Sequence, residues 1–291
     1  MPSIRVHAWG GLGSQLFAVA LIYDLKRSFP KRRIILVLHE GGVTKRISEI
    51  DSLFTFIKKK KISDNVVSES KFDLQSSGIP VQFEKERVRN SKIRNLLLLF
   101  GFLSLANTNE EFSRIRFWVV TIRGHYSYRT LCKPTLNEIY SEIKIASDTP
   151  PELKKLRDSV ALHFRLGDLT KLSSKSPIEE KELKMILSSL KEHQNLNCIL
   201  FSDSPKLASK LLTGAWNEKE IISVDVDSVK MLWLASNSKI FIGTNSKLSM
   251  WAALFKILEN VNSTIYMPKT LMINFENLLA TELTVSNRNY Y

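Results

Sequence analysis

The chain has 291 residues, of which 44% are apolar and 24% charged, so it has enough apolar material for two compact domains. Its scattered glycines and prolines and the lack of an internal repeat exclude a disordered, fibrous or repeat protein. The net charge of +13 calls for an anionic partner: nucleic acid, an anionic membrane surface or a phosphorylated small molecule. We expect no nucleic-acid partner, because no known binding motif stands out and the basic residues are spread along the chain.

The cysteines and the apolar segments indicate in which cellular compartment the protein is expected. Cys132 and Cys198 lie far apart and lack the spacing of zinc ligands, which predicts a reducing environment. Residues 1–9 read as a strand and not as a secretory signal. The apolar run at 96–103 is shorter than the ~20 residues that span a bilayer, and it predicts a buried or interfacial helix. We expect a cytoplasmic protein, and its basic charge leaves peripheral contact with the inner membrane surface open.

The first half of the chain predicts an opening β-α-β unit. Residues 3–9 form a short apolar strand, glycines at 10–13 form a turn, an apolar stripe at helical spacing follows, and residues 33–38 form a second strand. The pattern at 51–80 is irregular, and its four adjacent lysines are read as a solvated loop or helix end, with a phosphate-binding patch as the alternative. The half continues with a helix at 91–105, a strand at 115–122 and a helix at 134–145.

A composition break at 148–151 marks the predicted domain boundary, because two adjacent prolines continue neither helix nor sheet. Beyond it we expect strands at 160–164, 197–201, 220–224, 239–242 and 264–267, and helices at 177–193, 205–212, 228–235 and 246–258. This alternation predicts an α/β fold with parallel sheets. The N-terminal domain would be residues 1–149 and the C-terminal domain 150–291, with a ligand cleft between them and the last residues able to pack back on the first domain.

The turn at residues 10–15 is the first candidate for chemistry. Glycines at the end of a strand let the backbone approach a ligand, and the helix that follows presents N–H groups to an anion. A dinucleotide fingerprint would need a third glycine, which is absent, although Glu40 stands where a ribose-binding acid would lie. A tight turn without a ligand is the alternative interpretation.

The second candidate is the segment 163–168, at the end of the first strand of the second half. Strand alternation directs His163 and Arg165 to the same side, and the carboxyl ends of parallel strands are where open α/β sheets bind ligands. A guanidinium there can neutralise a diphosphate without changing its protonation state. The alternative is that Asp168 pairs internally with Arg165 and that His163 is a core histidine.

The third candidate runs over residues 227–236 and 240–253, where a strand leads through a polar turn into a helix. Asn245 or Ser246 can cap that helix and leave its amino end open to a phosphate, although capping without a ligand is the plainer interpretation. Directly after the strand expected at 220–224, Asp225 and Asp227 form a DxD string, which binds manganese in some glycosyltransferases of another fold. Because this string follows a late strand, we expect no metal.

In this order, the motifs resemble those of glycosyltransferase family 11, the α-1,2-fucosyltransferases. That family has a GGLGNQ-like turn, HxRRGD after a mid-chain strand, FSD in the next strand and an NSSFSWWAA-like segment. This chain shows GGLGSQ at 10–15, HFRLGD at 163–168, FSD at 201–203 and NSKLSMWAA at 245–253. Each string alone is short, so the specific signal is their conjunction across both halves.

The resemblance implies a GT-B fold, in which two Rossmann-like domains face one another, and inverting transfer of fucose from GDP-fucose to a hydroxyl of an acceptor glycan without a metal or other cofactor. It implies that Arg165 holds the diphosphate, with His163 and Asp168 as further catalytic residues. Asp168 is the first candidate for the base, with Asp24 and Glu40 as others. The implied donor-binding residues are Gly11, Gly13, Ser14, Asp203, Asn245, Ser246 and Ser249, and the implied acceptor-binding residues are Tyr126 and Tyr128.

The sequence departs from the family pattern at several of these positions. Leu166 replaces the second arginine, Ser14 replaces an asparagine, and Lys247 and Met250 stand where the family often has serine and tryptophan. The donor and the acceptor are therefore less well defined than the fold. For the acceptor, a free glycan and a lipid-linked glycan are both open. Two other classes stay open: a nicotinamide-dependent oxidoreductase that uses the glycine turn and Glu40, and a non-catalytic basic protein that binds nucleic acid or lipid.

Overall fold

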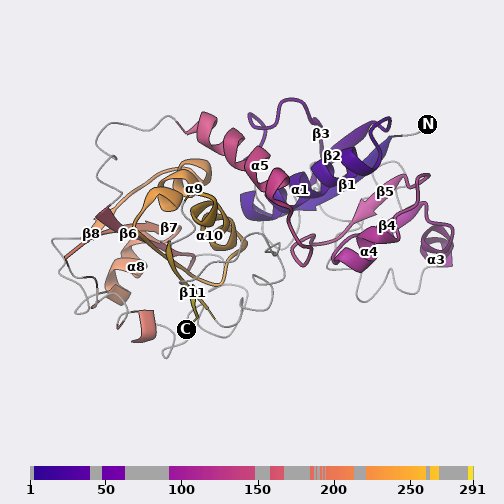
Figure 1. Cartoon of the computed structure of the whole chain (residues 1–291). Coiled ribbons are helices and arrows are strands. Elements are labelled where there is room, and N and C mark those ends of the chain that lie inside the picture. The colour runs from indigo at the N-terminus through magenta and orange to yellow at the C-terminus, as the bar shows by residue number, and fades with distance from the viewer. Residues whose placement is uncertain are drawn as a thin grey trace. The chain divides into compact units, whose positions relative to one another are not determined.

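The chain forms two compact units, residues 1–135 and 136–291, in a computed structural model (Figure 1). The structure describes residues 3–39, 48–62, 92–147, 158–166, 184–186, 188, 191, 193, 195–212, 221–259, 263–268 and 288–290. The division lies within the first turn of helix α5 (Lys133–Ala146), most of which groups with the second unit. The boundary expected at 148–151 falls outside the described residues.

The first unit is a parallel sheet that begins with the predicted β-α-β unit. Its elements are β1 (Ile4–Trp9), α1 (Leu12–Ser28), β2 (Ile34–His39), β3 (Lys58–Ile62), α3 (Lys92–Leu99), β4 (Leu103–Leu105), α4 (Asn109–Ser113) and β5 (Thr121–Arg123). The strand order is β3-β2-β1-β5-β4, and each neighbouring pair is parallel. The apolar face of α1 is buried, and Figure 1 shows this helix beside β1 and β2.

The lysine run departs from its predicted role as a solvated loop or helix end, because it forms strand β3 at the edge of this sheet. Residues 58–62 pair in register with residues 35–39 of β2. Lys59 is held by local carbonyls, with its Nζ 3.1 Å from the oxygen of Asp51, and Lys61 forms an ion pair with the Asp51 carboxylate. An edge strand tolerates lysines because their side chains reach water, and their charge discourages pairing with another chain.

Two other predicted elements of the first unit are shorter than their patterns suggested. The helix expected at 91–105 ends at Leu99, because Gly101 takes a left-handed backbone conformation with φ of 73° and β4 follows it. The strand expected at 115–122 is reduced to residues 121–123. In both places, a run of apolar residues predicted one continuous element, whereas the structure forms a shorter element.

The second unit is a six-stranded parallel sheet, one strand more than predicted. Its further elements are β6 (Ser159–Phe164), β7 (Asn197–Ser202), α8 (Pro205–Leu212), β8 (Ile221–Ser223), α9 (Ser228–Asn237), β9 (Ile240–Gly243), α10 (Lys247–Glu259), β10 (Thr264–Met267) and β11 (Arg288–Tyr290). The order is β11-β10-β9-β6-β7-β8. The additional strand β11 pairs with β10, so these last described residues belong to the second sheet.

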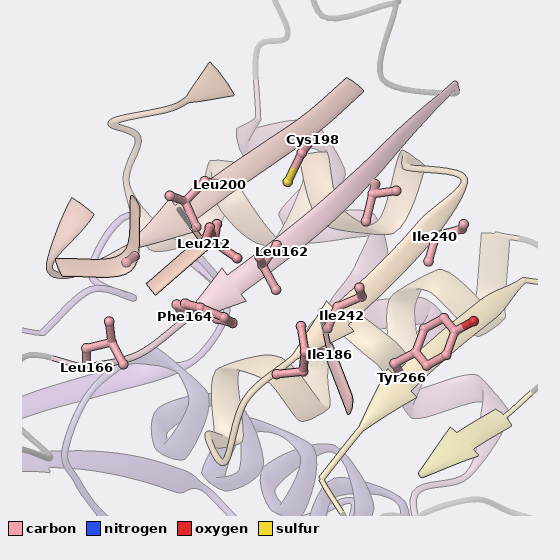
Figure 2. Close-up of a cluster of buried hydrophobic side chains, with 12 residues drawn as sticks. Leu162, Phe164, Leu166, Ile186, Cys198, Leu200, Leu212, Ile240, Ile242 and Tyr266 are labelled. Atoms are coloured by element: carbon pink, nitrogen blue, oxygen red, sulfur yellow. The ribbon is translucent and has the colours of Figure 1, made fainter. Parts of the chain in front are cut away.

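Strand β6 is buried along its whole length, as is typical of a central strand in a parallel sheet. On one face, Leu162 and Phe164 point into a core with Leu200 and Ile242 (Figure 2). Because side chains alternate along a strand, His163 lies on the opposite face. The pattern of this strand therefore fixes which residues build the core and which face the site.

Each sheet has one place where the strand order reverses. In the first unit this is β1, between β2 and β5, and in the second it is β6, between β7 and β9. In open α/β sheets, ligands bind outside the carboxyl ends of the strands at such a switch point. A ligand is therefore expected at one of two places. They are the residues that follow β6 and β9 in the second sheet, and the ends of β1, β2 and β5 in the first.

Candidate functional site

At the switch point of the second sheet, hydrogen bonds join the ends of β6 and β9 to helix α10. The Oγ1 of Thr244 donates to the backbone oxygen of His163 at 3.0 Å, and the Thr244 amide donates to the Oγ of Ser249 at 3.2 Å. That hydroxyl also lies 2.7 Å from the Nδ1 of His163. Two predicted site residues, His163 and Ser249, are thus brought together although they are far apart in the sequence.

His163 is held as a neutral, buried ring. Burial, and then the positive charge of Arg165, lower its pKa to about 4, while the carboxylate of Asp203 opposes this shift. A group with that pKa is not protonated near neutral pH and is poorly matched to proton transfer there. We therefore assign His163 a positioning role: it fixes Ser249, and through Ser249 the loop after β9.

The backbone after β6 is fixed on both sides. The Arg165 amide donates to the Oγ1 of Thr244 at 3.1 Å, and the Leu166 amide donates to the Oδ1 of Asp203 at 2.7 Å. Asp203, predicted as a donor-binding residue, thus has one carboxylate oxygen bonded to the backbone. These two bonds fix the backbone from which the Arg165 side chain extends.

Leu166 continues the apolar face of β6. Its side chain is buried in the core cluster with Phe164 and Ile186 (Figure 2). An arginine at this position would place its charge in an apolar core, which is unfavourable without a partner. The departure from the two-arginine motif therefore has a local physical reason in this chain.

The amino end of α10 is capped by Ser246. Its Oγ accepts from the Leu248 amide at 3.1 Å, and its backbone oxygen accepts from the Met250 amide at 3.1 Å. Asn245 is exposed beside it. The predicted capping role therefore belongs to Ser246, and Asn245 is the residue whose side chain can reach a ligand.

Lys247 in the first turn of α10 is the feature whose importance the sequence did not reveal. Burial, and then the charge of Arg165, lower the pKa of Lys247 to about 8. The first turn holds no acidic residue, although the positive end of a helix favours acids and disfavours cations. Two cations at a helix amino end repel each other, and an anion bound there would relieve that repulsion.

In the first unit, the turn before α1 already holds a carboxylate. The Leu12 amide donates to the Oε1 of Glu49 at 3.1 Å, while Gln15 donates from its Nε2 to the Gly10 oxygen at 2.8 Å. A phosphate at this helix end would meet the negative charge of Glu49. Gly11, Gly13 and Ser14 therefore lie at a helix end occupied by the protein itself, and we do not place the donor diphosphate there.

A cluster of rings lies at the carboxyl edge of the first sheet, and sequence analysis missed it. The rings of Trp9 and His39 stack at 4.3 Å, and the Nδ1 of His7 lies 2.8 Å from the Nε2 of His39. Burial, and then the charge of Arg123, lower the pKa of His7 well below its usual value. Among the described residues, nothing bonds to the buried His7 Nε2 or Trp9 Nε1. Trp9 and His39 are the last residues of the neighbouring strands β1 and β2, and His7 lies two residues before Trp9. Aromatic residues at neighbouring strand ends are the signal that could have found this cluster.

The two predicted acceptor tyrosines differ. Tyr126 is buried, and its hydroxyl donates to the His7 backbone oxygen at 2.6 Å, so its ring supports the first sheet and offers no surface to a sugar. Tyr128 is exposed. Only Tyr128 therefore keeps the geometry expected of an acceptor contact.

Two acids considered in the sequence have structural partners. Asp24 accepts from the Oγ1 of Thr135 at 2.9 Å and forms an ion pair with the buried Arg129, so its carboxylate is already engaged within the first unit. Asp227 caps α9, with its Oδ1 accepting from the Lys230 amide at 2.8 Å. Asp168 and Glu40 lie outside the described residues.

Comparisons with known proteins support the fold independently. No protein-family model and no curated protein matches the sequence. Among solved structures, the fucosyltransferase NodZ from Bradyrhizobium matches with a TM-score of 0.50 at 12% identity, over 87% of this chain and 92% of that one. E. coli heptosyltransferase WaaC with ADP-2-deoxy-2-fluoro heptose matches with a TM-score of 0.47 at 10% identity, over 99% and 93%.

At such low identity, the NodZ match establishes the fold alone. The chain has the GT-B fold, with two Rossmann-like domains built on parallel sheets. The fold expected from the motifs is thus confirmed, whereas the resemblance to family 11 in particular stays a prediction. In the described part of the chain, no helix is long and apolar enough to cross a membrane.

Proposed function

We propose that this protein is a glycosyltransferase that binds the diphosphate of a nucleotide-sugar donor between Arg165 and the amino end of α10. The observation that carries the proposal is the hydrogen bond from the Arg165 amide to the Oγ1 of Thr244 at 3.1 Å, which holds Arg165 next to the turn that opens α10, at the switch point of the sheet. An anion is the ligand that two cations and a positive helix end favour together. The GT-B fold agrees with this use.

We further propose that the donor is GDP-fucose and that fucose is transferred with inversion to a hydroxyl of an acceptor glycan, through an α-1,2 linkage and without a metal. The identity of the sugar rests on the motifs at 10–15, 163–168, 201–203 and 245–253. Tyr128 is the proposed acceptor contact in the first unit.

The proposed mechanism follows from where charge develops. As the bond between the anomeric carbon and the diphosphate oxygen breaks, the sugar becomes cation-like and the leaving group gains negative charge. The backbone at Arg165 and the amino end of α10 are held by hydrogen bonds, so the side chains of Arg165 and Lys247 extend from fixed positions to stabilise that charge. Asp168 is our candidate for the base that takes the acceptor proton, from its place three residues after Arg165.

The test is thermal unfolding with GDP, GDP-fucose, UDP-sugars and NAD(P)H, on the wild type and on Arg165→Ala. A ligand at ~100 times its dissociation constant stabilises the folded state by about 2.7 kcal/mol, so a specific donor gives a clear shift. We expect stabilisation by the guanine nucleotides, lost in Arg165→Ala. The exposed Lys239, at the start of β9 and hence at the opposite edge of the sheet, supplies the control Lys239→Ala, which should respond like the wild type.

Other outcomes would identify a different donor or a different class. Stabilisation by UDP-sugars alone would refute GDP-fucose and leave the diphosphate site standing. Stabilisation by NAD(P)H alone would favour the oxidoreductase, which Glu49 at the amino end of α1 already disfavours. No response to any nucleotide would reject the proposed function.

A further inference from the structure

Six large apolar side chains of the first unit are exposed on α3, on the turn between α3 and β4, and on the segment before β5. Figure 1 shows α3 beside β4. We call the six side chains the apolar patch: Leu96, Leu99, Phe100, Phe102, Phe117 and Trp118. Their exposed fractions run from 39% to 78%. They make up six of the eleven large apolar side chains that are exposed among the described residues, so the patch is a concentration and not a scatter.

The two segments of the patch are bonded side by side. The Nε1 of Trp118 donates to the Phe100 oxygen at 2.6 Å, and the Phe102 oxygen accepts from the Val120 amide at 2.9 Å. The rings of Phe117 and Trp118 meet edge to face at 4.8 Å. The tryptophan thus keeps its one polar atom satisfied within the protein while its ring stays partly exposed.

Helix α3 explains why the patch is so apolar. Leu96, Leu99 and Phe100 are spaced by three and four residues, and such positions share one face of a helix. All three are exposed. A surface helix normally presents polar residues on its outer face, so this arrangement indicates that an apolar surrounding covers it in the working protein.

The charge of the chain is concentrated in the same unit. Residues 1–135 hold 23 Lys and Arg against 11 Asp and Glu, a net charge of +12, while residues 136–291 hold 19 against 18, a net charge of +1. The basic residues are therefore not spread evenly, as the undivided sequence suggested. The unit that contains the proposed diphosphate site is nearly neutral, so that site does not account for the charge.

Some of this charge lies directly beside the patch. Arg116 is exposed, and its Cγ lies 3.0 Å from where a Cβ at Gly101 would be. Arg32 donates to the Val119 oxygen at 2.7 Å, and its neighbours Lys31 and Arg33 are exposed. The patch is therefore bordered by basic side chains.

We propose that the apolar patch docks the first unit on an anionic lipid membrane. Aromatic and aliphatic side chains beside lysine and arginine match the two layers of a membrane interface, the acyl boundary and the anionic headgroups. A second copy of this chain is disfavoured as the occupant, because it would bring a second unit of net charge +12 to the same surface. The proposal does not depend on which sugar the enzyme transfers.

The test is co-sedimentation of the full chain with vesicles of phosphatidylcholine alone and of phosphatidylcholine with about one third phosphatidylglycerol, a fraction chosen to give a strongly anionic surface. We expect binding to the anionic vesicles only, weakened but retained in high salt because the apolar contact persists. The double variant Leu99→Ser/Phe100→Ser should bind at least tenfold more weakly. Both side chains are exposed, so its melting temperature should stay near that of the wild type.

A matched control comes from the second unit. Ile145 is 79% exposed and Leu99 is 78% exposed, so Ile145→Ser makes the same kind of change away from the patch and should not alter vesicle binding. Arg116→Glu should weaken binding to anionic vesicles. Equal binding by the wild type and the double variant, or no binding at all, would overturn the proposal. Sedimentation of the wild type as a dimer that the double variant loses would assign the patch to a second copy instead.

Discussion

Lys247 is partly buried within reach of the positive charge of Arg165, and burial, followed by that charge, lowers the pKa of Lys247 to about 8. Arg165 follows strand β6, and Lys247 opens α10, the helix that follows the neighbouring strand β9. The protein tolerates this repulsion at the positive end of α10, where the dipole adds to it. A site built in this way is prepared for a ligand that carries negative charge.

Removing either charge should therefore weaken donor binding. We expect Lys247→Ala to raise the dissociation constant for GDP by about ten- to a hundredfold, since a hydrogen bond to a charged group contributes ~1.5–3 kcal/mol. Lys239→Ala, which removes an equal charge from the opposite edge of the sheet, should leave it unchanged. Isothermal titration of both variants measures this, and equal losses would show that only the overall charge matters.

The lowered pKa of Lys247 predicts that donor binding depends on pH. Below pH 8 the amine is charged and binding is full. Above pH 8 it must take up a proton for GDP to bind, and the dissociation constant should rise up to tenfold per pH unit. Lys247→Arg stays charged throughout this range, so its affinity should be flat between pH 7 and about 10. A wild-type profile as flat as that of the arginine variant would contradict the assignment.

His163 predicts a loss of stability in acid. Its folded pKa of about 4 lies below the ordinary value of 6.5, so the unfolded chain binds the proton more tightly. The stabilisation is complete above pH 6.5 and is lost as the pH falls toward 4, by on the order of 3 kcal/mol. His163→Asn should flatten this part of the profile in urea unfolding. The buried His7 contributes in the same direction, so some slope should remain.

Much of the fold could be predicted from apolar periodicity. The helix at 205–212 and the strand at 264–267 have the predicted bounds. Strand β6 begins one residue before its predicted start and ends where predicted. The strand at 58–62 could not be found, because lysine disfavours strands and only pairing with β2 places it there. The break after α3 depended on the left-handed backbone at Gly101, which periodicity does not reveal.

The candidate site residues could be predicted where they follow from the alternation of side chains along a strand or from the position of a strand end. His163 and Arg165 follow from the end of β6, and Ser249 from the turn that opens α10. Two features depended on contacts between distant residues: the closeness of Lys247 to Arg165, and the carboxylate of Glu49 at the amino end of α1. Sequence spacing does not predict either feature, because the course of the loops decides which of these distant residues come close together.

Glu49 supplies a direct test of where the anion binds. Its Oε1 accepts from the Leu12 amide at 3.1 Å, and its own amide donates to the Oε1 of Gln15 at 3.3 Å. Glu49→Gln keeps an oxygen acceptor but removes the charge, so we expect a loss of stability of about 0.3–1 kcal/mol from the helix dipole alone. GDP affinity should not change. A gain in GDP affinity would place the diphosphate at the glycine turn, against our assignment to α10.

Gly243 at the end of β9 sets how closely α10 approaches the sheet, and through it the whole arrangement of Thr244, Ser249 and His163. A Cβ at this position would lie 2.8 Å from the Ser249 Cβ and 2.8 Å from the Met267 Sδ, closer than side chains pack. Met267 is flexible, but Ser249 is fixed by its bonds to His163 and Thr244.

Gly243→Ala should therefore force α10 away from β9 and destabilise the second unit by about 1–3 kcal/mol, the usual cost of overpacking a core. It should weaken GDP binding as well, because Lys247 moves with the helix. Gly243 is not among the glycines with positive φ, so this loss comes from crowding of the new Cβ. In Gly10→Ala, by contrast, the Cβ would meet nothing closer than 3.4 Å but would sit at φ of 82°. If urea unfolding and GDP titration of Gly243→Ala match the wild type, the packing of α10 on β9 does not position the site.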